Sequence, residues 1–181
     1  MAIHDTDEIR NLLYRYAELI DDGDFDAVGE LFAAAEVDWG GDISHGAGPV
    51  AERLRATTRR YADGTPHTVH VIANPIIEVD GERAAARSRF IVVQPVGDGV
   101  LAPIIFGRYV DTFVRVDRQW RFASRRYVVE HLGDLSQHLP ESLVALLRSP
   151  AGWHLALTGR GICSRSWCSP LMTTGRWSST R

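Results

Sequence analysis

The amino-acid sequence predicts an α+β fold, because helical and strand patterns occupy separate parts of the chain. Up to about residue 61, apolar residues recur at the three- and four-residue spacing of amphipathic helices. From residue 68 onward, runs rich in Val and Ile alternate with short turn sequences. Helices segregated in this way pack on an antiparallel sheet, and a long curved sheet covered by helices leaves a concave pocket between the two layers.

Three helices and one short strand are expected in the first third of the chain. The longest helix begins at a capping residue, Asp5 or Thr6, and ends at the turn Asp22-Gly23-Asp24. Pro49 is well placed to begin the third helix. In order, the expected elements are a helix over 5–22, a short helix with Phe25, Val28, Leu31 and Phe32 on one face, a strand over 36–39, a glycine-rich loop over 40–48 and a helix over 49–61.

Four long strands follow, and the short turns between them predict an antiparallel meander. Asp80-Gly81 is a strong hairpin turn, and the next two turns are Gly97-Asp98-Gly99 and Asp117-Arg118. The expected strands cover residues 68–79, 83–96, 101–116 and 119–130, and a short helix over 140–147 follows them.

Composition limits the class of protein. A chain of 181 residues with 45% hydrophobic and 24% charged residues can form one packed domain. The net charge of -3 argues against a nucleic-acid partner, and no apolar run approaches the roughly 18 residues that a membrane span needs. The sequence shows no signal peptide and has two cysteines, so a reducing cytoplasm is the expected compartment. Because no lysine is present, a Schiff-base or P-loop lysine is excluded.

The composition changes near Ser149. Residues 149–181 hold four arginines and no acidic residue, together with both cysteines and three of the five tryptophans. We therefore expect a domain over 1–148 and a basic, poorly ordered tail over 149–181. The alternative is that this tail is a basic arm that binds a partner.

Four polar residues inside the apolar pattern are candidates for catalysis. Asp21 ends the first helix, Tyr16 lies five residues earlier, and His70 lies in the first long strand. A neutral histidine can take a proton from carbon or water, while a carboxylate fixes its tautomer. Tyr16, or Arg125 in the last strand, could polarise a carbonyl or support a leaving anion. This chemistry needs neither metal nor cofactor.

The alternation of side chains raises a question about Arg125. Trp120 and Phe122 mark the core face of the last strand, and a period of two then puts Arg125 on the opposite face. A β-bulge between them would turn Arg125 inward, but the sequence gives no sign of one.

Residues 5–135 resemble a SnoaL-like domain of the nuclear-transport-factor-2-like superfamily. The resemblance lies in the segments IRNLLYRYAELIDDGDFDAVGELF, HTVHVIANPIIEVDGERA and GRYVDTFVRVDRQWRFASRR. It implies a cone-shaped α+β barrel, with a curved antiparallel sheet and three N-terminal helices around a deep apolar pocket. By pattern, the most similar enzymes are scytalone dehydratase, hexachlorocyclohexane dehydrochlorinase and bile acid dehydratase.

The resemblance also implies roles for particular residues. Asp21 and His70 match the Asp–His dyad of these eliminating enzymes, Arg125 matches an arginine of the dehydrochlorinase, and Tyr16 matches a tyrosine of the bile acid dehydratase. The second histidine of scytalone dehydratase has no counterpart in residues 90–94. The expected pocket walls are Leu13, Phe32, Trp39, Ile72, Phe90, Phe106 and Tyr109.

The expected function is therefore a cofactor-independent lyase, a dehydratase or a related eliminating enzyme, acting on a small apolar cyclic substrate. His70 would remove a proton, Asp21 would orient His70, and Tyr16 and Arg125 would assist the leaving group. A homodimer or homotrimer through the exposed sheet is implied. Two alternatives remain: an isomerase or polyketide-cyclase-like enzyme with Asp21 as the base, and a non-catalytic ligand-binding or assembly protein.

Overall fold

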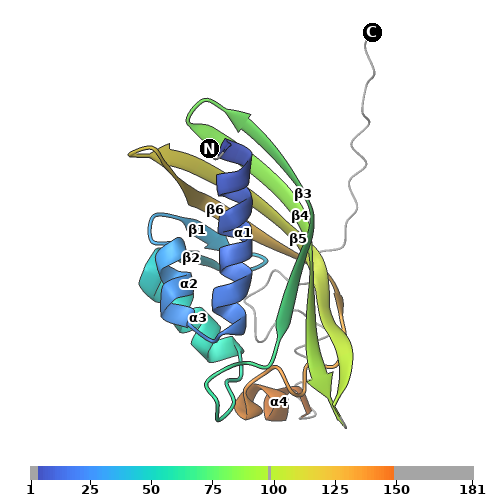
Figure 1. The fold of residues 1–181 in the computed structure, drawn as a ribbon. Helices are drawn as coiled ribbons and strands as arrows, with labels where there is room; N and C mark the ends of the chain where they lie inside the picture. Colours follow the sequence, from blue (N-terminus) through green and yellow to red (C-terminus); the bar gives the residue numbers. More distant parts are fainter. Residues whose placement is uncertain (1–3, 98, 149–181) are drawn as a thin grey trace, which may run out of the picture.

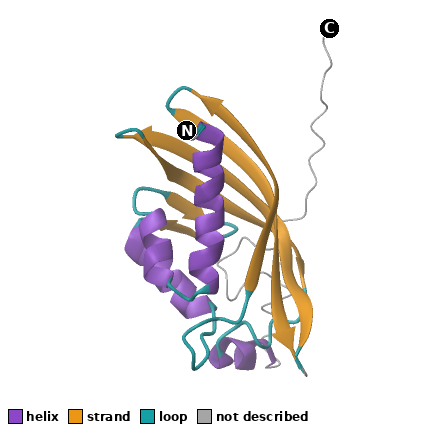
Figure 2. Ribbon diagram, in the orientation of Figure 1, coloured by secondary structure: helices purple, strands orange, loops and turns teal. Residues whose placement is uncertain are grey.

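The computed structural model describes residues 4–97 and 99–148, so the segment 149–181, expected to be a basic tail, lies outside the described residues. Helices pack on one side of a strongly curved sheet, which confirms the α+β prediction (Figures 1 and 2). The elements are α1 (Asp5–Asp21), α2 (Phe25–Leu31), β1 (Glu36–Asp38), β2 (Ile43–His45), α3 (Ala47–Thr57), β3 (Val69–Asp80), β4 (Arg83–Val96), β5 (Val100–Val116), β6 (Gln119–Leu132) and α4 (Glu141–Arg148).

The sheet has six strands in the order β2-β1-β6-β5-β4-β3. Strands β3 to β6 form the expected antiparallel meander, and β1 pairs in parallel with β6. The cone-shaped barrel implied by the resemblance is an open, strongly curved sheet, because β2 and β3 remain as its two edges. Strand β2 lies where a loop was expected. Gly40 and Gly41, with φ of 93° and 112°, form the turn that brings the chain back alongside β1.

Helix α1 lies across the concave face of the sheet and supplies much of the core (Figure 1). Its buried residues follow the expected helical spacing, and α2 begins where the Asp24 carboxylate accepts a hydrogen bond from the Ala27 backbone N–H at 3.0 Å. In the described part of the chain, no helix combines the length and the hydropathy that a bilayer crossing needs. The buried face of α1 consists of Ile9, Leu13, Tyr16, Leu19 and Ile20.

A β-bulge in β6 settles the orientation of Arg125. Thr112 pairs with Ser124, but the next residue of β5, Phe113, pairs with Phe122, so Ala123 is an extra residue in β6. The extra residue shifts the alternation by one position. Arg125 therefore faces the same buried interior as Phe122, and its side chain is fully buried.

Phe106 lies on the face of the sheet opposite to Tyr109. The two residues are three positions apart on β5, so alternation along the strand turns their side chains to opposite faces. Phe106 pairs with Ile91, and its ring centroid lies 5.6 Å from the Arg89 guanidinium carbon. The structure thus places Phe106 on the outer face of the sheet. The other six expected residues pack in or against the core cluster: Leu13, Phe32, Trp39, Ile72, Phe90 and Tyr109.

Candidate active site

The structure brings Asp21 and His70 into direct contact. Asp21 is the last residue of α1, and His70 is the second residue of β3, which packs along that helix. The His70 Nδ1 atom lies 2.6 Å from Asp21 Oδ1, and the His70 backbone N–H donates to Asp21 Oδ2 at 2.7 Å. The carboxylate therefore fixes both the backbone and the ring of His70.

Thr68 completes the hydrogen bonding of the carboxylate. Its hydroxyl donates to Asp21 Oδ1 at 2.7 Å, so both carboxylate oxygens are engaged. Sequence reasoning gave Thr68 no role. The available signal was the period of two, which puts Thr68 and His70 on the same face of one strand.

The contact with Asp21 selects the tautomer of His70. Because Nδ1 faces a carboxylate, the neutral ring carries its proton on Nδ1 and a lone pair on Nε2. Within residues 4–97 and 99–148, no hydrogen bond to Nε2 is found. The His70 side chain is 8% exposed and that of Asp21 is 22% exposed. The pair therefore sits at the margin of the core, where Nε2 can accept a proton from a ligand.

A second charged pair lies deeper in the molecule. Arg125 on β6 donates from Nε and Nη2 to the two carboxylate oxygens of Asp111 on β5, at 2.8 and 2.9 Å. Both side chains are 0% exposed. Burial opposes the charge of Arg125, but the adjacent carboxylate more than offsets it and raises the pKa of the guanidinium above its usual range. Aromatic rings surround the guanidinium carbon at 4.1–5.9 Å: Tyr16, Phe32, Tyr109, Phe122 and Tyr127.

Tyr16 connects the two pairs. Its ring lies edge-on to the His70 ring at 6.2 Å, and the Arg125 guanidinium lies 4.3 Å from its centroid. The Tyr127 hydroxyl donates to the Tyr16 hydroxyl at 2.8 Å. Burial is the main cause that raises the pKa of both tyrosines well above 10, so both stay protonated at neutral pH. Sequence reasoning gave no role to Tyr127.

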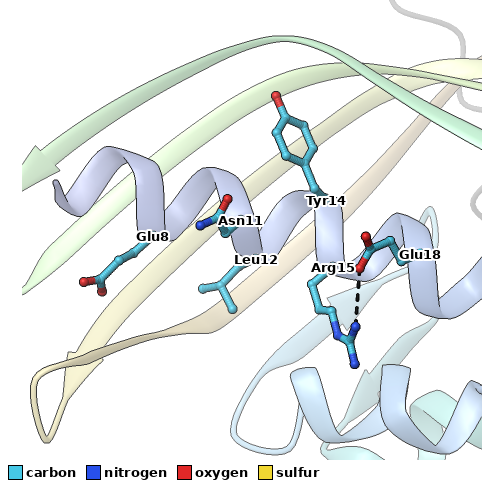
Figure 3. A pocket seen from close by; sticks show the side chains of 6 residues that line it. All are labelled: Glu8, Asn11, Leu12, Tyr14, Arg15 and Glu18. Atoms are coloured by element: carbon cyan, nitrogen blue, oxygen red, sulfur yellow. Dashed lines mark hydrogen bonds and ion pairs between the residues drawn. The ribbon is translucent and has the colours of Figure 1, made fainter. Parts of the chain in front are cut away.

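Two hollows on the surface of the described residues lie away from the dyad. One covers the outer side of α1 and is lined by charged and polar side chains, including Arg15 and Glu18, which form an ion pair at 3.3 Å (Figure 3). The other lies between the end of α3 and the start of α4 and is lined by Arg55, Arg59 and Glu141, among others. The Tyr16 ring packs against the rings of Phe32, His70 and Tyr109, at centroid distances of 5.8–6.2 Å. In the described residues, no group of three or more acidic, His or Cys side chains could hold a metal ion.

Comparison with solved structures reveals relatives of the same fold. An NTF2-like protein with a cystatin-like fold from Novosphingobium aromaticivorans is 25% identical, with a TM-score of 0.59 over 80% of this chain and 90% of that one. A candidate scytalone dehydratase from the same organism is 22% identical, with a TM-score of 0.57 over 70% and 85%. An aspartate-to-asparagine variant of a protein of unknown function from Mycobacterium tuberculosis is 25% identical, with a TM-score of 0.59 over 69% and 76%.

No curated protein matches the chain. The family model of the SnoaL-like domain matches residues 1–126, which include α1, the dyad and both charged residues of the buried pair. The chain therefore belongs to the SnoaL-like domain family of the nuclear-transport-factor-2-like superfamily.

Proposed function

We propose that the protein is a cofactor-independent lyase that catalyses a dehydration or a related elimination on a small apolar cyclic substrate. The observation that carries the proposal is the hydrogen bonding of Asp21 and His70. Three hydrogen bonds hold the carboxylate. The bond to His70 Nδ1 leaves Nε2 as the proton-accepting atom of the ring. The enclosing core of aromatic and aliphatic side chains suits an apolar ring.

The proposed reaction has one base and one leaving group. His70 Nε2 takes a proton from a carbon next to the carbon that bears the leaving group. The electron pair of the broken C–H bond forms a carbon–carbon double bond, and the leaving group departs with the pair of its own bond. When hydroxide leaves, the proton on His70 is returned to it and water is released. Asp21 stabilises the imidazolium between these two steps.

Tyr16 and Arg125 act on the leaving group in this proposal. Tyr16 remains a protonated hydrogen-bond donor, and its ring lies beside that of His70. Arg125 is engaged with Asp111 and acts through its charge next to the Tyr16 ring rather than by touching the substrate. The positive end of the buried pair of Arg125 and Asp111, held next to the Tyr16 ring, favours negative charge that develops on the departing group.

The test compares two histidines of the same segment. His67 forms an exposed pair with Asp63 at 2.8 Å, so His67→Ala is a matched control for His70→Ala. Both variants and the wild type are incubated with a panel of small cyclic alcohols and halides, and products are identified by mass spectrometry. We expect turnover to fall at least about 100-fold in His70→Ala and to stay within about twofold in His67→Ala. Unchanged turnover in His70→Ala would end the proposal.

An isomerase or cyclase with Asp21 as the base is the competing hypothesis for an enzyme. Both Asp21 oxygens already accept hydrogen bonds from Thr68 and His70, which weighs against direct proton abstraction by the carboxylate. Loss of activity in Asp21→Asn together with full activity in His70→Ala would favour this reading.

A ligand-binding or assembly protein is the non-enzymatic alternative, and the packing of Tyr16 against Phe32 and Tyr109 favours it. Ligand binding without a product by mass spectrometry would support it. We also propose a homodimer or homotrimer through the outer face of the sheet, where Val69 is 56% and Val71 44% exposed. Light scattering of Val71→Arg tests this assembly, and a variant with unchanged mass would contradict it.

A further inference from the structure

Gln94 presents an unsatisfied hydrogen-bond acceptor inside the core. It lies on β4, two residues beyond Val92, which pairs with His70, and it is 1% exposed. Its Nε2 donates to the Pro66 carbonyl at 2.8 Å and to the Gln137 carbonyl at 3.4 Å. These two bonds fix the orientation of the amide. Its Oε1 is buried and has no hydrogen-bond partner among the residues that the structure describes.

His138 presents a second unsatisfied atom at the same end of the sheet. It follows Gln137 in the segment between β6 and α4 and is 9% exposed. Its Nδ1 is buried and has no hydrogen-bond partner in residues 4–97 and 99–148. The segment is held in place, because the Arg59 N–H donates to the His138 carbonyl at 2.7 Å and the Tyr61 hydroxyl donates to the Gln137 carbonyl at 2.8 Å. His138 is therefore a fixed part of this region.

The dyad is close to this second histidine. Burial, together with the charge of nearby His70, lowers the pKa of His138 to about 4. His138 is consequently neutral at pH 7, with one ring nitrogen available as a donor. Val92 on β4 pairs with His70, and Gln94 is the next residue on the same face of β4. Gln94 therefore lies about 7 Å along the strand from the position opposite His70.

Two unsatisfied atoms of this kind need an explanation. A buried polar atom without a partner destabilises a protein by about 1–3 kcal/mol, and native proteins rarely leave such atoms unpaired. Gln94 Oε1 and His138 Nδ1 lie on neighbouring segments that are joined by the bond from Gln94 to Gln137. A ligand group that pairs with both would remove the penalty.

We propose that Gln94 Oε1 and His138 Nδ1 bind a hydroxyl group of the substrate beside His70. An amide oxygen can only accept, so the ligand must donate to it. A hydroxyl group donates to Gln94 and accepts from the Nδ1–H of His138 at the same time. A halide or a hydrocarbon cannot donate, and an ionised carboxylate would place a second acceptor against the Gln94 oxygen. This inference rests on the proposed function, and it narrows the substrate class to alcohols.

The experiment uses a pair of probes of equal shape, 2-indanol and indane, titrated into the full-length protein and followed by NMR. Because one net hydrogen bond contributes about 1 kcal/mol, we expect 2-indanol to bind the wild type at least about fivefold more tightly than indane. Gln94→Met and His138→Phe should bring this ratio to within about twofold. His138→Asn, whose amide keeps a donor, should preserve it.

Three results would overturn the inference. Equal binding of the two probes to the wild type would do so, because it would indicate that a bound water already forms hydrogen bonds with Gln94 Oε1 and His138 Nδ1. An unchanged ratio of the two affinities in folded Gln94→Met or in folded His138→Phe would also contradict it. If His138→Phe does not fold, Gln94→Met alone decides the outcome. His70→Ala separates the two proposals, because it should keep the probe ratio while turnover is lost. A preserved ratio without any turnover in the wild type would contradict the proposed function alone.

Discussion

Two acid–base pairs, Asp21 with His70 and Asp111 with Arg125, differ chiefly in burial. Asp21 and His70 lie where α1 meets the edge strand β3, and both side chains keep some exposure. Asp111 and Arg125 lie on the central strands β5 and β6 and have none. Each pair has one carboxylate and one nitrogen base held by short hydrogen bonds.

The difference in burial indicates different roles for the two pairs. A partly exposed imidazole can gain and lose a proton within a reaction, whereas a buried guanidinium with a raised pKa stays charged throughout. The pair of Asp21 and His70 therefore suits proton transfer. The pair of Asp111 and Arg125 suits a permanent electrostatic role, and its loss should damage folding more than chemistry.

The largest expected effect comes from breaking the buried pair. Arg125→Met leaves the Asp111 carboxylate buried and without its partner, so we expect the free energy of unfolding to fall by about 3–5 kcal/mol. Arg126→Met, at the exposed neighbouring position, is the control and should change it by less than about 0.5 kcal/mol. Urea unfolding measures both variants. Equal stability of the two would show that the buried pair is not structural.

A smaller effect is expected from the pH dependence of His138. Burial and nearby His70 lower its pKa to about 4 from an ordinary 6.5. Between these values the unfolded chain takes up a proton and the folded chain does not, so stability falls as the pH drops from 6.5 towards 4, by about 3 kcal/mol in total. His138→Leu should remove this part of the dependence. Parallel stability curves for the wild type and His138→Leu over this range would contradict the assignment.

The smallest expected effect sharpens the account of the dyad. Thr68→Val keeps the shape of the side chain but removes one of the hydrogen bonds to Asp21, and we expect the free energy of unfolding to fall by about 1–2 kcal/mol. Thr112→Val, which removes an exposed hydroxyl paired with Ser124, should cost less. Thermal unfolding compares the two variants. A larger loss in Thr112→Val would contradict the role of Thr68.

Periodicity predicted much of the fold. Helical spacing located α1, and the turn sequences located the ends of the long strands, because both signals are local. The bulge at Ala123 could not be predicted, since it depends on which residues of β5 face β6. The side to which Phe106 points could have been predicted, because Phe106 is three residues from Tyr109 and alternation puts the two on opposite faces.

The sequence predicted only part of the candidate site, because local patterns do not show which distant residues meet. Asp21 and His70 were predicted as polar residues inside the apolar pattern and then matched a family pattern. Alternation along one strand could have added Thr68. His138 lies in the segment between β6 and α4, where no periodic pattern places a side chain. Its closeness to His70 follows from tertiary hydrogen bonds through Tyr61 and Gln94.

Asp21 holds His70 with its proton on Nδ1 and its lone pair on Nε2. Nitrogen-15 NMR of the histidine rings, at a pH where His70 is neutral, measures this tautomer directly and needs no substrate. We predict the Nδ1–H tautomer for His70 in the wild type, and a shift towards a mixture of the two tautomers in Asp21→Asn. An Nε2–H tautomer in the wild type, or the same spectrum in both proteins, would contradict it.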